Sequence, residues 1–143
     1  MHFSVAAAAL VTLASTALAG SAIVQNNCPE EVYLTITRGD QSSSQLKLAG
    51  NGGKYSEPLS GNGNSFGLTK SSDYYSASTP KLIWGFSDAA PTLYYSVSSV
   101  DGDAFAGEQW QLSASDSGCG VVNSSDGATH ACADSNDFTF ALC

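Results

Sequence analysis

Basic residues are scarce in this sequence. Lys and Arg number 5 among 143 residues, against 13 Asp and Glu, which gives a net charge of −8. A chain with so few cations cannot neutralise a run of phosphates or dock on anionic lipid headgroups, so nucleic-acid and membrane-surface binding are excluded. All five bases lie within residues 20–81 beside five acids, whereas residues 82–143 carry eight acids and no base. The whole net charge therefore belongs to the second half of the chain.

Long apolar segments are also lacking, apart from one at the N-terminus. An apolar stretch from residue 5 to 18 ends in Ala17-Leu18-Ala19, which is typical of a secretory signal peptide cleaved after Ala19, with Ala22 as the alternative. The stretch is shorter than the roughly 20 residues of a membrane-spanning helix and lacks strong positive flanks. The sequence thus predicts a signal peptide at 1–19 and a single domain at 20–143. We expect a secreted, extracellular product without a transmembrane segment, associated with a cell wall at most non-covalently.

Cysteines are few, even in number and all located after the leader: Cys28, Cys119, Cys132 and Cys143. In a secreted chain this indicates disulfides, for which three pairings exist. Because Cys119 and Cys132 enclose a short Gly- and Ser-rich segment, we expect a local disulfide between them, which leaves Cys28 to pair with Cys143. The CxxC and CxxH spacings of zinc sites are absent, and no metal or cofactor is expected.

Helical periodicity is absent after the leader, and apolar residues recur with a period of two. Val32, Leu34 and Ile36 alternate with polar neighbours in the clearest example. Gly-, Asn- and Asp-rich turns separate these runs. About eight to ten short antiparallel strands in an all-β sandwich or barrel are predicted. The runs fall at 22–26, 32–37, 45–49, 53–59, 65–70, 82–86, 93–97, 108–114 and 138–142.

Complete catalytic and metal-binding motifs are lacking. After the leader the sequence has one histidine, His130, and a Ser-His-Asp arrangement would need it together with Asp126 or Asp134; we expect an ordinary loop residue. The run 101–108 has acids at the first, third and eighth positions but not the EF-hand spacing, so it predicts a turn rather than a calcium site. Arg38-Gly39-Asp40 matches a tripeptide of integrin ligands, but it equally suits a plain surface turn.

Acidic residues could still serve a sugar site. Glycoside hydrolysis needs two carboxyl groups about 5 to 9.5 Å apart, and a single sequence does not show which acids converge. The alternative is that the acids are dispersed and only keep the chain soluble. Tyr94, Trp84 and Trp110 are available for stacking on sugar rings, although aromatic residues in strands usually belong to the core. The acidic candidates are Glu57, Asp101, Asp103 and Glu108.

One N-glycosylation sequon occurs, Asn123-Ser124-Ser125, in a segment expected to be a surface loop. Given secretion, the sequence predicts a glycan at Asn123.

Several segments together resemble the thaumatin-like fold. The segment 24–29 followed by 32–34 resembles its opening strand pair, and 95–102, which reads Tyr-Ser-Val-Ser-Ser-Val-Asp-Gly, resembles a later strand. The segments 52–58 and 102–107 resemble the fungal branch, the Blastomyces yeast-phase-specific domain family or antigenic thaumatin-like proteins. The resemblance spans residues 22–143. It implies a flattened β-sandwich in which the first and last cysteines are joined, which agrees with the pairing expected above.

The same resemblance guides the functional expectation. Plant relatives carry an acidic cleft associated with β-1,3-glucan binding and, in some, weak glucanase activity. Asp101 matches one cleft aspartate, but Ser96 stands where the other would be, and about 124 residues leave no room for the loop domains that wall the cleft. Fungal members are known as secreted or cell-surface antigens with roles proposed in adhesion and host interaction. We therefore expect a non-enzymatic monomer, an adhesin or host-directed effector, that meets cell-wall polysaccharide or a host surface or apoplastic protein; the alternative is a β-1,3-glucan-binding module or weak endoglucanase.

Overall fold

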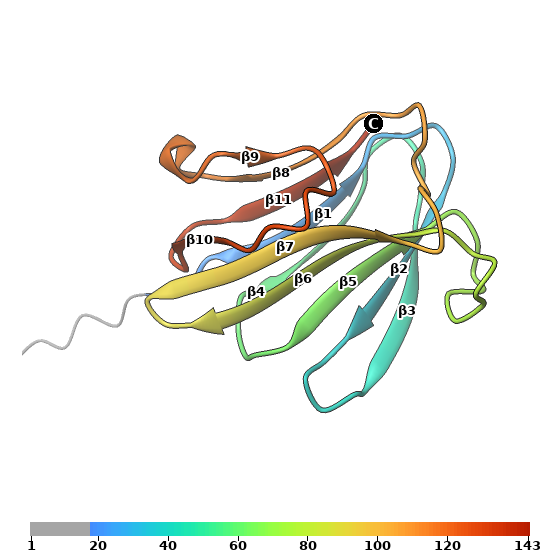
Figure 1. The fold of residues 1–143 in the computed structure, drawn as a ribbon. Coiled ribbons are helices and arrows are strands. Elements are labelled where there is room, and N and C mark those ends of the chain that lie inside the picture. Colours follow the sequence, from blue (N-terminus) through green and yellow to red (C-terminus); the bar gives the residue numbers. More distant parts are fainter. Residues whose placement is uncertain (1–17) are drawn as a thin grey trace, which may run out of the picture.

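The structure is a computed structural model that describes residues 18–143, so the predicted leader, apart from its last two residues, lies outside the described part. Two β-sheets face each other, as Figure 1 shows. One has five strands in the order β4-β1-β11-β8-β9, and the other has six in the order β10-β7-β6-β5-β2-β3. The strands are β1 (Ser21–Asn26), β2 (Val32–Thr37), β3 (Ser43–Leu48), β4 (Gly53–Pro58), β5 (Asn64–Thr69), β6 (Lys81–Ala89), β7 (Thr92–Val100), β8 (Trp110–Ala114), β9 (Val121–Val122), β10 (His130–Ala133) and β11 (Phe138–Leu142).

The core lies between the sheets and is built by the alternation seen in the sequence. Leu34 and Ile36 of β2 are buried, as are Phe138, Phe140 and Leu142 of β11. Aromatic rings join the two layers: Trp84 of β6 meets Phe140 edge-on, with 6.1 Å between ring centroids. Edge-to-face contacts of this kind add to the free energy gained by burying the rings. The prediction of an all-β sandwich is confirmed.

The pairing of β1 with β11 is parallel, whereas the other strand pairs of the described residues are antiparallel. This arrangement brings the first and last strands together in the middle of the five-stranded sheet. It differs from the all-antiparallel expectation, and the described part holds eleven strands rather than eight to ten because β9 and β10 are very short. Within residues 18–143, no helix has the length and apolar character needed to cross a membrane.

Both disulfides join elements that the topology has already brought together. Cys28 and Cys143 follow the parallel strands β1 and β11 and form a bond, with 5.0 Å between their Cα atoms. Cys119, in the single turn of 3-10 helix at Ser117–Cys119, is bonded to Cys132 of β10. The second disulfide therefore ties a loop of the five-stranded sheet to the edge of the six-stranded sheet. Both predicted pairings are present.

Candidate functional site

The four acidic residues considered from the sequence lie at two separate ends of the molecule. Glu57 of β4 contacts Arg38, which follows β2. Asp101 follows β7 beside Lys81, the first residue of β6. The register through β2, β5, β6 and β7 sets Arg38 and Asp101 at opposite ends of the six-stranded sheet, roughly 20 Å apart along the strands. Glu57 thus shares no cleft with Asp101.

Glu57 is engaged in a bidentate ion pair. Arg38 Nη1 donates to Glu57 Oε1 over 2.6 Å, Nη2 donates to Oε2, and the Tyr55 hydroxyl also donates to Oε2. Burial alone would raise the pKa of Glu57, but the hydrogen bonds and charge of Arg38, with the Tyr55 hydroxyl, hold that pKa below its usual value. The same contact ties down the arginine of the Arg38-Gly39-Asp40 tripeptide, which leaves that motif poorly suited to adhesion.

The other three acids lie at one end of the sheets, and each has its own partner. Asp101 Oδ2 accepts from Lys81 Nζ, Glu108 Oε1 accepts from Lys70 Nζ over 2.7 Å, and Asp103 Oδ1 accepts from the Phe105 amide over 3.0 Å. Lys70 and Lys81 belong to the neutral half of the sequence. In the folded chain they neutralise two acids of the acidic half.

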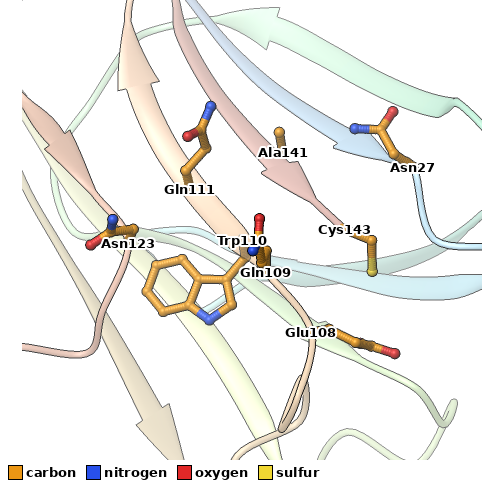
Figure 2. A pocket seen from close by; sticks show the side chains of 8 residues that line it. All are labelled: Asn27, Glu108, Gln109, Trp110, Gln111, Asn123, Ala141 and Cys143. Atoms are coloured by element: carbon orange, nitrogen blue, oxygen red, sulfur yellow. The ribbon is translucent and has the colours of Figure 1, made fainter.

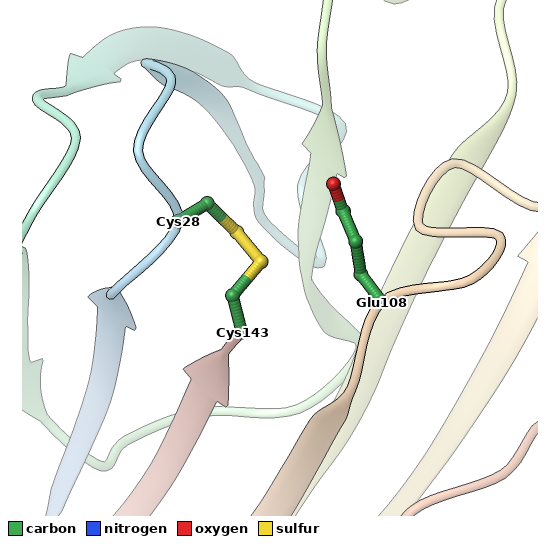
Figure 3. A group of neighbouring side chains, drawn as sticks. All are labelled: Cys28, Glu108 and Cys143. Carbon is green, nitrogen blue, oxygen red and sulfur yellow. A yellow bond between two sulfur atoms is a disulfide. The ribbon is translucent and has the colours of Figure 1, made fainter.

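Glu108 also lies beside the Cys28–Cys143 disulfide, as Figure 3 shows. One oxygen of Glu108 and the two sulfur atoms lie within 4.8 Å of one another. Both sulfur atoms are held in the disulfide and are not thiolates, so we assign no metal to this group.

His130 is paired rather than poised for catalysis. Its Nε2 lies 3.2 Å from Asp126 Oδ2, and its ring stacks on Tyr95 with 5.5 Å between centroids. Among the described residues no serine hydroxyl hydrogen-bonds to it. The expectation of a non-catalytic loop histidine agrees with these contacts, although His130 begins the short strand β10.

A carboxyl pair that the sequence did not reveal lies at the β6–β7 hairpin. The buried Asp134 lies at this hairpin, where its amide donates to the Pro91 carbonyl over 3.1 Å, and Asp88 belongs to β6. The Oδ1 atom of Asp88 is buried without a partner in the described part of the chain. Burial, followed by the charge of Asp134, raises the pKa of Asp88. The pair lines none of the hollows found on the described surface.

This pair predicts a pH dependence of stability. An acid whose pKa is raised on folding binds more protons in the folded chain than in the unfolded one, so the free energy of unfolding rises as pH falls from neutrality toward about 4, the ordinary aspartate pKa. Asp88→Asn should raise the free energy of unfolding at pH 7, and its free energy of unfolding should increase less than that of wild type when the pH is lowered. Urea unfolding of both proteins at pH 7 and pH 5 measures it. A larger stability gain on acidification in Asp88→Asn than in wild type would contradict the assignment.

A hollow of about 570 Å³ lies at the end of the five-stranded sheet (Figure 2). Its volume is within the range of about 300–1,000 Å³ that small-molecule sites occupy. Amide side chains dominate the lining, together with one indole and one carboxyl group. The lining residues are Asn27, Glu108, Gln109, Trp110, Gln111, Asn123, Ala141 and Cys143.

Strand geometry places these side chains. Leu112 of β8 is buried, so Gln111, its neighbour in the strand, points to the outer face, beside its partner Ala141 of β11. The register between β8 and β9 pairs Leu112 with Val122, and one further residue sets Asn123 opposite Gln111. The hollow therefore follows from the alternation of β8 and from the early end of β9.

Trp110 is only half buried, because β9 pairs with Leu112 and Ser113 but does not reach the start of β8. Its ring is fixed edge-to-face against Phe140, with 5.6 Å between centroids. The side-chain amides of Gln109, Gln111 and Asn123 are exposed and form no hydrogen bond within residues 18–143, so their donors and acceptors are open to a ligand.

Sequence reasoning named Trp110, Glu108 and Asn123 separately but did not place them in one site. It missed Asn27, Gln109 and Gln111 altogether. The signal that could have found them is the alternation Gln109-Trp110-Gln111, which predicts two amides on the outer face of a strand whose inner face carries an indole. Asn27 comes close through the parallel pairing of β1 and β11, which alternation cannot reveal.

Comparisons with known proteins give the chain its family. A family model described as Blastomyces yeast-phase-specific protein matches residues 9–143. An antigenic thaumatin-like protein of Arthroderma benhamiae is 28% identical over 170 aligned positions, which cover 97% of this chain and 80% of the relative. The resemblance inferred from the sequence is confirmed.

Solved structures agree. The protein elicitor MoHrip2 from Magnaporthe oryzae is similar with a TM-score of 0.72 and 26% identity, over 87% of this chain and 99% of that one. The thaumatin-like xylanase inhibitor TLXI is similar in fold alone, with a TM-score of 0.58 and 12% identity over 85% of this chain and 98% of the inhibitor. With a model match over nearly the whole sequence and a thaumatin-like fold, the chain belongs to the Blastomyces yeast-phase-specific protein family.

Proposed function

We propose that this protein is secreted and binds cell-wall polysaccharide, with β-1,3-glucan as the ligand class, through the hollow around Trp110, without cleaving it. The observation that carries the proposal is the lining of the hollow, which includes four side-chain amides and one half-buried indole. The two disulfides and the predicted leader support secretion.

The chemistry of the lining suits a sugar chain. The amides of Gln109, Gln111 and Asn123 each offer a free donor and a free acceptor, which matches hydroxyl groups that also do both. Asn27 Oδ1 accepts from Gln25 Nε2 over 3.0 Å, so Asn27 offers mainly its Nδ2 donor. The indole of Trp110 offers an apolar ring whose orientation Phe140 fixes, so little conformational freedom is lost on binding. The amides are neutral, and the one acidic side chain of the lining, Glu108, is bound to Lys70. Neutral hydroxyl-bearing ligands therefore fit this lining better than cations or anions.

Binding without hydrolysis follows from the carboxyl groups. Both glycosidase mechanisms need two carboxyl groups flanking the scissile bond. Glu108 is the one acidic side chain among the residues that line the hollow, and its Oε1 accepts from Lys70 over 2.7 Å. The family relatives, an antigen and an elicitor, also favour an interaction protein over an enzyme.

Gln111→Ala tests the binding site directly. Removing the exposed amide of Gln111 should weaken laminarin binding about fivefold, which corresponds to about 1 kcal/mol for a lost hydrogen bond. The effect on folding should be small, because the side chain is exposed and forms no hydrogen bond within residues 18–143. Trp110→Leu, which keeps an apolar contact with Phe140 but removes the flat indole, should weaken binding more than tenfold. Affinity electrophoresis in gels with and without laminarin measures both.

Gln45→Ala is the control outside the hollow. The Gln45 amide, unlike that of Gln111, donates to Thr35 Oγ1 and to the Ser72 carbonyl, so circular dichroism first checks that this variant is folded. Gln45 is an exposed amide on β3, in the other sheet and away from the hollow. This variant should bind laminarin like the wild type. These proteins are produced without N-glycosylation. Failure of the unglycosylated wild type to bind laminarin would rule out the hollow as a glucan site, and so would an equal loss of binding in all three variants. Release of reducing ends by the wild type would rule out the non-catalytic proposal.

A host-directed role is the second candidate, favoured by the likeness to the elicitor MoHrip2 over 99% of that chain. Infiltrating the purified protein into leaf tissue should then trigger an oxidative burst that the reduced and alkylated protein does not. Equal responses to the two forms would remove this candidate.

A further inference from the structure

We propose that an N-linked glycan on Asn123 covers the hollow, so that glycosylation decides whether the site is open to polysaccharide. Asn123 is the acceptor of the one sequon in the sequence, and its side chain lines the hollow itself (Figure 2). The control of polysaccharide binding rests on the proposed function, whereas the covering of the hollow does not.

The position of Asn123 makes the glycan and an incoming ligand compete. The register of β8 and β9 sets Asn123 opposite Gln111, and the same hollow includes Trp110. Asn123 is exposed at the end of β9 and forms no side-chain hydrogen bond in the described part of the chain. A sugar on its amide nitrogen therefore disrupts no internal contact and starts within the volume that an outside sugar chain would occupy.

The modification is an ordinary group transfer. The secretory machinery supplies an oligosaccharide linked to a lipid pyrophosphate. A bond forms between Asn123 Nδ2 and the anomeric carbon of the first sugar, and the bond from that carbon to the pyrophosphate oxygen breaks. The lipid pyrophosphate leaves with the electron pair, and Nδ2 gives up one proton. Asn123 remains uncharged, so the hollow changes in shape and hydrogen-bonding capacity rather than in charge.

The two tryptophans of the chain provide a readout that does not depend on binding. Trp84 is 0% exposed, whereas Trp110 is half buried at the hollow. Quenching of tryptophan fluorescence by iodide therefore reports on Trp110. A glycan that covers the hollow shields this indole.

The experiment compares four proteins secreted from a glycosylating yeast: the full-length wild type, Ser125→Ala, Asn123→Gln, and the double variant Ser125→Ala/Gln41→Asn. Ser125→Ala removes the sequon and keeps the Asn123 amide, at the cost of a 2.9 Å contact between the Ser125 and Ser99 hydroxyls. Asn123→Gln removes the glycan and keeps that contact.

The double variant moves the glycan to a remote site. Gln41→Asn creates a sequon with Ser42 and Ser43 in the β2–β3 turn, which lies at the opposite end of the molecule from the C-terminus and the hollow (Figure 1). Position 41 has φ of 69°, a left-handed conformation that asparagine tolerates well. Intact mass shows which proteins carry a glycan.

We expect wild type to carry a glycan and to show an iodide quenching constant at least twofold lower than that of the other three proteins. Wild type should also bind laminarin at least tenfold more weakly than Ser125→Ala and the double variant, which both keep the free Asn123 amide. Equal quenching of wild type and Ser125→Ala would overturn the inference, as would equal shielding by the glycan at position 41. A wild type left unmodified at Asn123, in a host that modifies position 41, would also overturn it. If Ser125→Ala and Asn123→Gln bind no laminarin while quenching still separates them from wild type, the proposed function fails and the covering of the hollow stands.

Discussion

Replacing Cys28 and Cys143 together by alanine should lower the free energy of unfolding by about 4 to 5 kcal/mol, the entropy cost of closing a loop of this length. The two cysteines are 115 residues apart in sequence. They close the end of the parallel pair β1–β11, in the middle of the five-stranded sheet. Without the bond, the pairing of the first and last strands must itself close the long loop between them, at the full cost in chain entropy. The midpoint of thermal unfolding should fall by roughly 15 °C for a chain of this size.

Cys119→Ala/Cys132→Ala is the control. It removes a disulfide between residues only 13 positions apart, worth about 3 kcal/mol in the same loop-closure model. Guanidinium unfolding of both double variants ranks them. If the short loop proved the more costly to open, chain entropy would not be the main contribution of the long disulfide, and the link that Cys119–Cys132 makes between the two sheets would be the better explanation.

The strands could be predicted because burial on one face leaves a direct mark on the sequence. In β2, alternate residues are buried: Val32, Leu34 and Ile36. Their neighbours are partly exposed, with the exception of Thr35, which is also buried and accepts a hydrogen bond from Gln45. Turns such as Asp101-Gly102 were equally visible, and both residues have positive φ there. Alternating burial and turn conformation depend on residues that are close together in the chain, so both can be predicted from a single sequence.

The partner of each strand could not be predicted in the same way. A strand has a period of two whether its neighbour is parallel or antiparallel, so the side-by-side arrangement of β1 and β11 leaves no trace in either segment. β9 and β10, with two and four residues, are too short for a period to be recognised. Their positions matter for function, because the early end of β9 exposes the indole of Trp110.

The acidic residues were poor guides to a binding site, because the sequence does not show which of them form ion pairs in the folded chain. Lys70 and Glu108 are 38 residues apart, and Arg38 and Glu57 are 19 apart, yet each pair is in contact. Amide side chains, by contrast, do not stand out in a sequence whose surface residues are mostly small and polar. The hollow consists mainly of them, and only the fold brings Asn27 and Asn123 to the two sides of Gln111.

The second large effect is expected for Lys81→Met, which should lower the free energy of unfolding by about 3 kcal/mol, the lower end of the cost of breaking a buried ion pair by removing one partner. Lys81 is 6% exposed, and its ammonium uses all three donors. They reach the Ser76 carbonyl at 3.0 Å, the Thr79 carbonyl at 2.8 Å and Asp101 Oδ2. Methionine fills the same space but leaves these acceptors unpaired. The side chain of Asp101 is 32% exposed, so water recovers part of the loss.

The loss should be concentrated in the segment between β5 and β6. Lys81 holds this segment through Ser76 and Thr79, and its Nζ lies 5.8 Å from the centre of the Tyr74 ring, which packs against Gly67. Hydrogen exchange should therefore accelerate in residues 71–79 of Lys81→Met more than in β2 or β11. Circular dichroism during urea unfolding measures the global effect.

A double variant separates the ion pair from simple packing. Lys81→Met/Asp101→Asn removes the carboxylate that Lys81→Met leaves without its partner, and asparagine tolerates the left-handed φ of 57° at position 101. It should therefore be more stable than Lys81→Met alone. If it is not, the carbonyls of Ser76 and Thr79 carry the effect and the pair with Asp101 adds little. Laminarin binding should stay unchanged in the folded double variant, because neither residue lines the hollow. A loss of binding there would place the site at Asp101 rather than in the hollow.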